Sequence, residues 1–419
     1  MKIINNIKKF MLNFKNLGSN KLTLVASFIG LFLVSIGLSL LVFSLISPKG
    51  ASQLVNNIAQ KAKVDLSAPK VAECPINGLK YTKAEEDIWN KRRPVVAMIE
   101  NNIEARPESG LSKADVVYEA VAEGGITRFT SVFYCGVAAQ NVKAAPIRSA
   151  RVYFVNMAAG YGDNPIYLHQ GGANNFCSDC PGGVKPRSDI DKTVDAYALL
   201  DKLGWRNGSK GNDMDGGFNI GFPIVVRDQY RLGSTAAAWE HSVVADLDEV
   251  YKEATKRGYE FKDSAEVAWT QGFKKWAFQD GKADSAGTAT DIKFGFWNNQ
   301  LDYDVEWKYD AANNSYLRFN GGVAHVDNEF DKPQLSAKNV AIMFATEKGP
   351  VDNEKHMFYQ VIGTGKAKVF QNGTVVDGTW SKASALDREV FYDTNGKEIQ
   401  MVRGTTWVEI VPAGNTISY

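Results

Sequence analysis

The chain has 419 residues and carries 48 Lys and Arg against 47 Asp and Glu, so its net charge is +1 at pH 7. A charge this close to zero gives no basis for expecting a nucleic-acid partner or an acidic one. Hydrophobic residues make up 44% of the chain, which is enough to build one or two globular cores.

The first feature along the chain is an uncharged apolar run at residues 22–46, LTLVASFIGLFLVSIGLSLLVFSLI. It is long enough to cross a bilayer as one slightly tilted helix. Residues 1–21 contain lysines but no acidic residue, which predicts a basic cytoplasmic tail and a cytoplasmic N-terminus. We therefore predict a single-pass, type II protein of the cell membrane whose domains lie on the extracytoplasmic side.

Two other ways of leaving the cytoplasm fit this run less well. A cleaved signal peptide has a shorter apolar core and a small-x-small cleavage site, whereas residues 45–49 read LISPK. No cysteine follows the run closely, so a lipid-modified cysteine is not expected. The apolar run is predicted to be a retained anchor.

All cysteines lie on the predicted extracytoplasmic side, where disulfides persist; they are Cys74, Cys135, Cys177 and Cys180. Four cysteines allow three pairings, and the sequence does not choose among them. We expect structural disulfides. Zinc held by all four thiolates is a weaker alternative because there is one C-x-x-C, and the Pro-Gly-Gly after Cys180 argues against a redox pair at Cys177 and Cys180.

Residues 47–75 are polar and alanine-rich and are predicted to form a linker between the membrane and the first domain. Within residues 76–280 short apolar or alternating runs are followed by a few helical patterns. The predicted strands cover residues 94–102, 115–120, 126–134 and 165–168, and the predicted helices cover 149–159, 195–203 and 245–257. The glycine-rich residues 205–225 are predicted to form an irregular loop. This first domain is predicted to be mixed α/β.

A second domain is predicted over residues 291–419, where short alternating strands are separated by turn residues. Asn372-Gly373 and Asn395-Gly396 favour hairpins because a type I′ turn needs positive φ at both central residues. The tryptophans of this region lie in alternating runs and are predicted to be core residues rather than a sugar-stacking surface. The whole chain is predicted to be α+β, with an antiparallel, β-rich C-terminal domain.

The usual catalytic motifs are absent from the sequence. There is no H-E-x-x-H, G-x-S-x-G, P-loop or Rossmann fingerprint, and no metal or cofactor is predicted. Residues 212–216, NDMDG, resemble part of a calcium loop but lack its closing Glu, so we expect a solvated turn there. The four histidines form no ligand motif.

Charged residues at the ends of apolar runs give the best candidate site in the first domain. They are Glu119, Glu123, Arg128, Arg148, Arg151 and His169. Such groups can converge at one edge of a sheet, where clefts form and where Arg binds carboxylate or phosphate bidentately. The competing interpretation is a set of internal ion pairs that fix loops in place.

Several long segments resemble the YerB-like family of bacterial envelope lipoproteins. The first domain carries RPVVAMIENNIEARPESGLSKADVVYEAVAEGGITRFTSVF, then APIRSARVYF and LHQGG. The second carries YLRFNGGVAHVD, GTGKAKVFQNGTVVDGTWSK and FYDTNGKEIQMVRGTTWVEIVP. The resemblance spans about residues 76–419 and implies a mixed α/β layered sandwich in two domains of unknown function.

The resemblance also implies which positions matter. They are Arg106, Glu119, Glu123, Gly124, Gly125, Arg128, Arg148, Ser149, Arg151, His169 and His241. The chain departs from the family in having an apolar anchor in place of the lipid-modified cysteine, and in an insertion at residues 177–221. Glu240 and Ser242 stand where the family has Pro and Asn around His241, which puts a role for that histidine in doubt.

Two functions remain open. The first is a non-catalytic envelope module that binds a wall polymer, or an enzyme acting on it, through Arg106, Arg128, Arg148, Arg151, His169 and His241. The second is a hydrolase or transferase on wall polymers, with Glu119 or Glu123 as general acid or base and His169 as its partner. We favour binding because no nucleophile with an activating base is evident from the spacing.

Overall fold

One mixed sheet of eleven strands runs through the described part of the chain. The computed structural model describes Gly30 and residues 64–175, 191–207 and 211–419. Among these residues no helix is long and apolar enough to cross a membrane. The predicted cytoplasmic tail (1–21) and, apart from Gly30, the predicted span (22–46) lie outside the described residues, as do Cys177 and Cys180.

The large sheet has the strand order β21-β20-β19-β17-β23-β4-β5-β3-β7-β8, with β18 paired to β17. Its strands from the first half of the chain are β3 (Val95–Glu100), β4 (Val116–Glu123), β5 (Ile126–Phe133), β7 (Ile166–His169) and β8 (Asp213–Asp215). Those from the second half are β17 (Asn339–Lys348), β18 (Phe358–Gln360), β19 (Gly363–Gln371), β20 (Thr374–Lys382), β21 (Val390–Asp393) and β23 (Thr406–Pro412).

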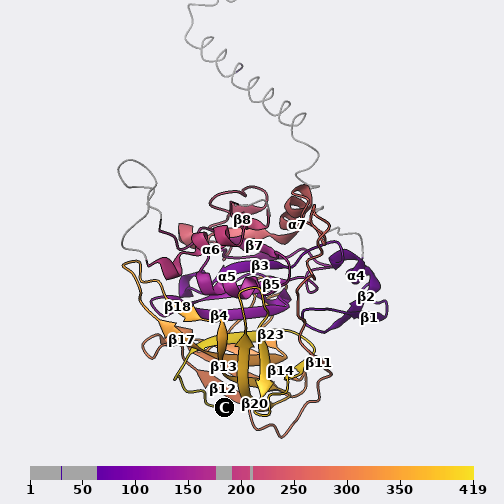
Figure 1. Cartoon of the computed structure of the whole chain (residues 1–419), viewed down its shortest axis with the longest axis vertical. Helices are drawn as coiled ribbons and strands as arrows, with labels where there is room; N and C mark the ends of the chain where they lie inside the picture. The colour runs from indigo at the N-terminus through magenta and orange to yellow at the C-terminus, as the bar shows by residue number, and fades with distance from the viewer. Residues whose placement is uncertain (1–29, 31–63, 176–190, 208–210) are drawn as a thin grey trace, which may run out of the picture. The chain divides into compact units, whose positions relative to one another are not determined.

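Strand β23 joins the two halves of this sheet. It pairs in parallel with β17 on one side and with β4 on the other. All of its residues are buried, as expected for a strand with neighbours on both sides and layers on both faces. In Figure 1 the indigo and magenta strands therefore continue directly into the orange and yellow ones.

A second sheet packs against the large one. It consists of β12 (Asp291–Phe294), β13 (Val305–Asp310), β14 (Ser315–Asn320), β15 (Val323–Ala324) and β16 (Ser336–Ala337), all paired antiparallel. Trp307 of β13 meets Trp407 of β23 edge to face with 5.3 Å between ring centroids. Both indoles are almost fully buried, so these tryptophans form core between the layers.

The remaining described strands form three smaller sheets. They are β1 (Lys70–Glu73) with β2 (Lys80–Thr82), β6 (Lys143–Ala144) and β9 (Val225–Arg227) on either side of β10 (Val243–Asp246), and β11 (Phe278–Gln279) with β22 (Met401–Val402). Strand β1 begins inside the segment predicted to be a linker, where it is paired antiparallel with β2. The described end of the predicted linker therefore contains a paired strand.

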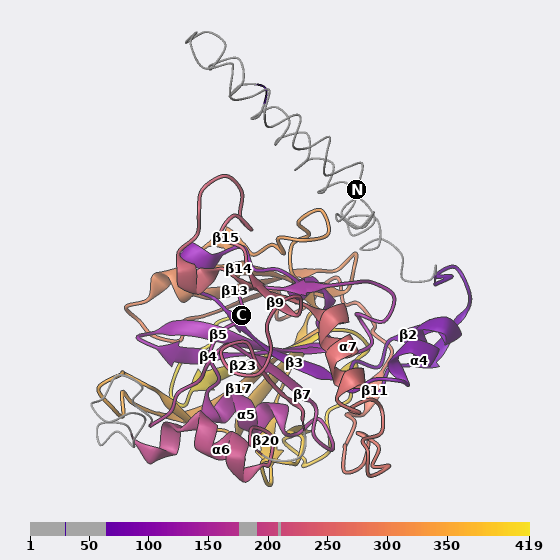
Figure 2. The same cartoon turned by 90° about the horizontal axis from the view of Figure 1, so that it is seen from above.

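The helices are short and lie at the surface of the sheets. They are α4 (Lys83–Trp89), α5 (Val152–Ala158), α6 (Ala196–Lys202) and α7 (Leu247–Lys256), with 3-10 turns η1 (Ile103–Ala105), η2 (Leu111–Lys113), η3 (Lys192–Val194), η4 (Trp239–His241) and η5 (Leu301–Tyr303). Helices α5 and α6 pack against each other, whereas α7 lies apart from them (Figures 1 and 2). The described residues thus form a strand-rich α+β fold, as predicted.

Local sequence explains several of these elements. In α7 the buried residues are Leu247, Val250, Tyr251 and Ala254, which recur at helical spacing. The hairpin between β19 and β20 turns at Asn372 and Gly373, with φ of 56° and 78°, as the Asn-Gly signal predicts. The prediction of a loop throughout residues 205–225 is wrong, because Asp213–Asp215 forms β8 and pairs in parallel with β7.

Candidate functional site

The carboxyl ends of β3, β7 and β8 meet at one edge of the large sheet because these strands run parallel. Glu100 ends β3, His169 ends β7 and Asp215 ends β8. The antiparallel strands β4 and β5 bring Glu123 and Arg128 to the same edge, since Arg128 is the cross-strand partner of Glu100. In open α/β sheets, ligands commonly bind outside the carboxyl ends of parallel strands.

Charged side chains gather at this edge in what we call the arginine cluster. It comprises Glu100, Glu123, Arg128, Arg148, Arg151 and His241. Arg148 and Arg151 reach the cluster because the chain at Ile147 and Ala150 forms bridges alongside the ends of β3 and β7. With three arginines and two glutamates, the cluster carries a net charge of +1 when the histidine is neutral.

Glu123 is held between two arginines. Arg151 donates to it from Nε and Nη2, and Arg128 Nη2 donates at 3.3 Å. Burial alone would raise the pKa of Glu123, but the positive charges of Arg151 and Arg128 outweigh it and lower the pKa to about 2. The carboxylate therefore stays ionised at any physiological pH.

Arg128 is the inner guanidinium of the cluster. Burial, opposed by the charge of Glu123, lowers its pKa to about 10. Its Nη1 donates to the carbonyl of Ser149 at 3.2 Å. Its buried Nε has no hydrogen-bond partner among the described residues. An unpaired N–H on a buried cation is costly, so this group adds to the cost of burying Arg128.

Glu100 anchors the outer half of the cluster. Arg148 Nε lies 3.0 Å from Glu100 Oε1, and His241 Nδ1 lies 2.7 Å from Oε2. Arg148 Nη1 also donates to the carbonyl of Glu240 at 3.2 Å. The acceptor is a backbone carbonyl. The hydrogen bond is therefore kept even though Glu240 stands where the family resemblance implies a proline. His241 thus positions Glu100, which in turn orients Arg148.

Arg148, Arg227 and Trp239 form the outward side of the cluster, which we call the arginine–tryptophan surface. The guanidinium of Arg227 lies 4.3 Å from the centroid of the Trp239 ring, and its Nη1 donates to the Trp239 carbonyl at 2.6 Å. Burial and the nearby charge of Arg148 lower the pKa of Arg227. Both arginines donate to carbonyls of the same turn, Arg227 to Trp239 and Arg148 to Glu240, next to an indole that is 60% exposed.

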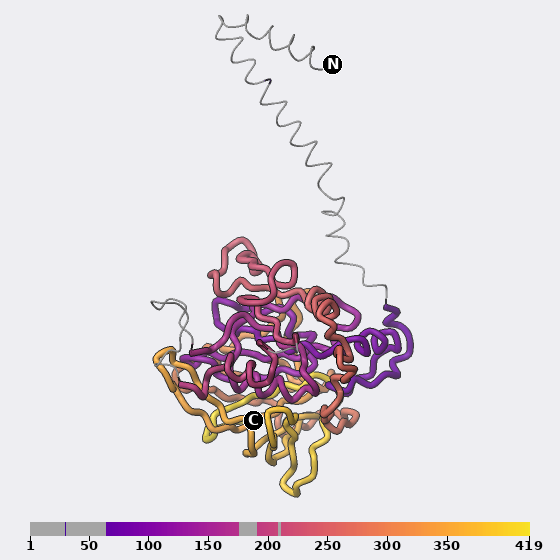
Figure 3. Tube along the Cα trace, turned by 45° about the horizontal axis from the view of Figure 1, so that its top comes forward, coloured from indigo at the N-terminus to yellow at the C-terminus, as the bar shows by residue number. Residues whose placement is uncertain are grey.

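The segment that carries this surface is rich in exposed aromatic residues. Between β8 and β10 the exposed rings belong to Phe218, Phe222, Tyr230 and Trp239. Figure 3 follows the chain through this part, between the magenta and the orange segments. The sequence does not predict Arg227 or Trp239 as site residues, because their segment has no apolar periodicity. They come near Arg148 only through the pairing of β9 with β10.

His169, the last residue of β7, is fully buried. Its Nδ1 lies 2.7 Å from the carbonyl of Gly171, and its Nε2 lies 2.7 Å from Oδ1 of Asp213. Burial would lower the pKa of His169, but the hydrogen bond and the charge of Asp213 raise it overall. Both ring nitrogens face acceptors, which favours the protonated ring.

Asp213 and Asp215 are also buried, so the prediction of a solvated turn at residues 212–216 is wrong. Arg206 Nη1 donates to Asp215 at 2.9 Å and lies 3.4 Å from Asp213, and the backbone N–H of Gly171 donates to Asp215 at 2.8 Å. These carboxylates are therefore bound by groups of the protein itself, and they fix the LHQGG segment against β8.

Besides His169, the candidate residues Glu119 and Arg106 lie outside the arginine cluster. Glu119 is fully buried, where it accepts hydrogen bonds from Thr127 Oγ1 at 2.6 Å and from Arg318 Nη2 at 2.5 Å. Arg106 donates to Asn101 Oδ1 at 2.8 Å and to the carbonyl of Asp302 at 2.8 Å. Both side chains connect the large sheet to the second sheet and its flanking turn η5.

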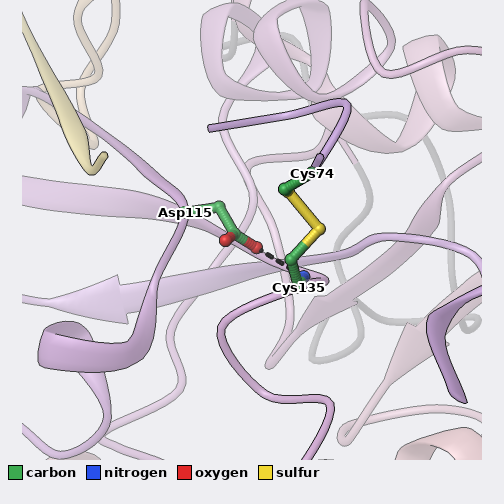
Figure 4. Close-up of side chains that lie close together, drawn as sticks. All are labelled: Cys74, Asp115 and Cys135. Carbon is green, nitrogen blue, oxygen red and sulfur yellow. Dashed lines mark hydrogen bonds between the residues drawn. A yellow bond between two sulfur atoms is a disulfide. The ribbon is translucent and has the colours of Figure 1, made fainter. Parts of the chain in front are cut away.

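Cys74 and Cys135 form a disulfide that links the chain after β1 to the end of β5 (Figure 4). Asp115 lies beside it and accepts hydrogen bonds from the backbone N–H groups of Tyr134 and Cys135 at 2.7 and 2.9 Å. Burial, opposed by these bonds, raises the pKa of Asp115 to about 7. The three side chains lie close enough to share a metal ion, but the bonded sulfurs are not available as thiolate ligands.

The sequence matches the family described as "Protein of unknown function (DUF3048)" in two stretches. Its N-terminal domain matches residues 79–216, and its C-terminal domain matches residues 292–408. The chain therefore belongs to this family, whose YerB-like members it resembled from the sequence. The N-terminal match ends just after β8. It therefore includes every residue of the arginine cluster except His241.

A relative and a solved structure agree with this assignment. The chain is 29% identical over 359 residues to the "Putative lipoprotein YerB" of Bacillus subtilis (strain 168), covering 86% of this chain and 92% of that protein. It also resembles the crystal structure of the YerB protein from Bacillus subtilis, with a TM-score of 0.63 and 26% identity. That match covers 83% of this chain and all of the solved one.

Proposed function

We propose that the protein is anchored in the cell membrane by residues 22–46 and works on its extracytoplasmic side as a non-catalytic binding module. The apolar run and its lysine flanks support the anchor and its direction. The Cys74–Cys135 disulfide suits an oxidising compartment outside the cytoplasm. The resemblance to a protein named as a lipoprotein supports the same location. The ligand is an anionic polymer of the cell envelope.

The observation that carries this proposal is that Arg148 and Arg227 donate to the carbonyls of two consecutive residues, Glu240 and Trp239, which places both guanidinium groups beside the same turn. Glu100 pairs with Arg148, and the charge of Glu240 offsets part of the charge of Arg227, so a bound anion would relieve the repulsion that remains between the two arginines. Arg148 keeps 26% of its side chain exposed, and Arg227 is exposed and fixed in place by Trp239. A phosphate or carboxylate group can accept hydrogen bonds from both guanidinium groups, which suits repeated anionic units of a polymer.

The candidate catalytic groups are poorly placed for a reaction. Glu119 and His169 are fully buried and occupied by Arg318 and Asp213. Glu123, with a pKa of about 2, is too weak a base and cannot hold a proton as a general acid near neutral pH. A carboxylate-dependent hydrolase or transferase therefore stays the second candidate, favoured only by the 25% exposure of Glu123.

The test uses the full-length protein in detergent and soluble poly(glycerol phosphate), with affinity measured by titration calorimetry at low and high salt. We expect saturable binding that weakens with salt and is at least about tenfold weaker in the double variant Arg148→Gln, Arg227→Gln. The control, Lys70→Gln with Lys282→Gln, makes the same charge change at exposed positions elsewhere and should bind normally.

Incubation with isolated wall sacculi tests for a reaction. We expect no soluble fragments by mass spectrometry. Fragments that disappear in Glu123→Gln would establish the catalytic alternative instead, and equal affinity of the double variant and the wild type would overturn the binding site.

A further inference from the structure

The large sheet forks in its C-terminal half, and a cavity of about 1000 Å³ lies in the fork. Strand β17 pairs with β19 from Asn339 to Met343 and then pairs with β18 from Thr346 to Lys348. Strand β19 continues along β20 over its whole length, from Gly363 to Gln371. The two strands therefore diverge beyond Met343, and residues of both line the cavity.

Trp380 closes the floor of the fork. Its Nε1 donates to the carbonyl of Phe344 at 2.8 Å, which bridges the separating strands. The indole passes over Gly365, where a Cβ atom would lie 2.5 Å from Nε1, so this position requires glycine. With the indole in this place, an extended peptide cannot add as a further strand at Gly365, and the cavity must recognise its ligand through side chains.

The side chains that line the cavity are mainly neutral hydrogen-bonding groups. They belong to Thr346, Thr364, Thr379, Thr394, Gln360 and Asn415. Two of them already donate within the protein, Thr364 Oγ1 to the Trp380 carbonyl and Asn415 Nδ2 to the carbonyls of Gly295 and Phe296. The charged lining residues balance, because Lys366 and Lys368 are offset by Asp377 and Asp393. Lys368 and Asp377 form an ion pair at 2.5 Å. The half-buried Phe344 and Ile362 supply apolar surface.

We propose that this cavity binds a segment of a neutral carbohydrate chain. Hydroxyl groups of a sugar are both donors and acceptors, as are the hydroxyls of the lining threonines, and neither side carries net charge. The ring of Phe344 can contact the apolar face of a sugar. The volume lies at the upper end of about 300–1,000 Å³ for ligand sites, which fits several sugar units rather than one.

The carbohydrate site is separate from the anion-binding site, and its function does not depend on anion binding. The cavity lies between β17, β19 and β20, whereas the arginine cluster lies at the end of β3 and β7. The two sites differ in charge, so their ligands respond differently to salt. Affinity of the neutral site is expected to change little with ionic strength, unlike affinity for poly(glycerol phosphate).

The test titrates the full-length protein with an N-acetylglucosamine tetramer, with affinity measured by calorimetry. Thr379→Val should weaken binding about fivefold because it removes one hydroxyl at nearly constant volume. Thr379→Trp fills the cavity and should abolish binding. Thr235→Val, at an exposed position between β9 and β10, is the matched control, and the double variant Arg148→Gln, Arg227→Gln should bind the tetramer normally.

Failure of the wild type to bind the tetramer, or undiminished binding by Thr379→Trp, would overturn the proposal. So would saturable binding of an extended peptide in the same cavity without binding of the tetramer. Circular dichroism spectra that match the wild type would exclude misfolding as the cause of a loss. Because poly(glycerol phosphate) binding is measured separately, failure of either proposal is visible without the other.

Discussion

Arg318 of β14 donates a hydrogen bond of 2.5 Å to Glu119 of β4, although 199 residues separate the two in the sequence. A second bond of 2.8 Å runs from Arg318 to Glu409 of β23, and all three side chains are fully buried. One cation thus connects the second sheet to two neighbouring strands of the large sheet. This ion group holds the two sheet layers in register, and it explains why Glu119 is unavailable to a substrate.

The two glutamates should differ in their contribution to stability. Burial raises the pKa of Glu409 well above its ordinary value, and the charge of Glu119 raises it further against the opposing charge of Arg318, so Glu409 keeps its proton to a higher pH than an ordinary carboxyl group. Glu409→Gln should therefore change the free energy of unfolding by less than about 1 kcal/mol. Glu119→Gln removes the counter-charge of buried Arg318 and should cost about 3 kcal/mol.

Urea unfolding of the two variants measures this difference. The substitutions are chemically identical and lie on adjacent strands, so each is the control for the other. A larger loss in Glu409→Gln than in Glu119→Gln would show that Glu409 carries the charge instead.

Glu123 should make the protein more sensitive to acid. Its pKa falls from an ordinary 4.5 to about 2 in the folded state, so its contribution is present above pH 4.5 and is lost as pH falls towards 2. The contribution is at most about 3 kcal/mol. Thermal unfolding between pH 2 and 6 should show a weaker acid dependence in Glu123→Gln than in the wild type.

The exposed Glu266 offers the matched control, because Glu266→Gln removes a carboxylate that is 79% exposed. Its unfolding profile should follow that of the wild type. Identical profiles for the Glu123 variant and the wild type would mean that Arg128 and Arg151 do not stabilise the ionised carboxylate.

The Cys74–Cys135 disulfide closes a loop with a sequence separation of 61 residues. Reduction, or the double variant Cys74→Ala, Cys135→Ala, should lower the free energy of unfolding by about 2–4 kcal/mol, because the unfolded chain gains freedom. Thermal unfolding with and without a reductant measures the effect. The double variant should not respond further to the reductant through this pair, and a wild type of unchanged stability after reduction would contradict the prediction.

Local patterns predicted the elements whose own sequence carries an apolar run or a turn signal. The apolar runs at β3, β4, β5 and β7 and the Asn372-Gly373 turn are of this kind. Strand β8 has the sequence Asp-Met-Asp, which indicates a strand only once His169 and Arg206 are known to bind its carboxylates. The position of β23 between β17 and β4 depends on pairing across distant parts of the chain, which no local pattern contains.

The same distinction applies to the candidate site. Glu123, Arg128, Arg148 and Arg151 end or follow apolar runs, and the structure brings them together. Glu100 also ends such a run, but it is not among the site residues that the sequence predicts. Its role depends on His241, which lies 141 residues further along the chain. Glu119 looks like its neighbour Glu123 in the sequence, yet strand pairing directs it to Arg318 rather than to the arginine cluster.

His169 and Asp213 should behave as an ion pair within the protein. A neutral imidazole has one N–H and cannot donate to both the Gly171 carbonyl and Asp213, whereas a protonated ring can. Since the pKa of His169 is raised in the folded state, its contribution to stability is complete below pH 6.5 and is lost as pH rises through the raised pKa.

The chemical shifts of the ring nitrogens, measured by NMR across this range, should show a protonated ring above pH 6.5. Asp213→Asn removes the anion and should lower the pKa of His169, so that the ring becomes neutral at a lower pH, while the exposed Asp87→Asn should leave it unchanged. A wild-type ring that is already neutral at pH 6.5 would contradict the ion pair and would leave Arg206 as the counter-charge of Asp213.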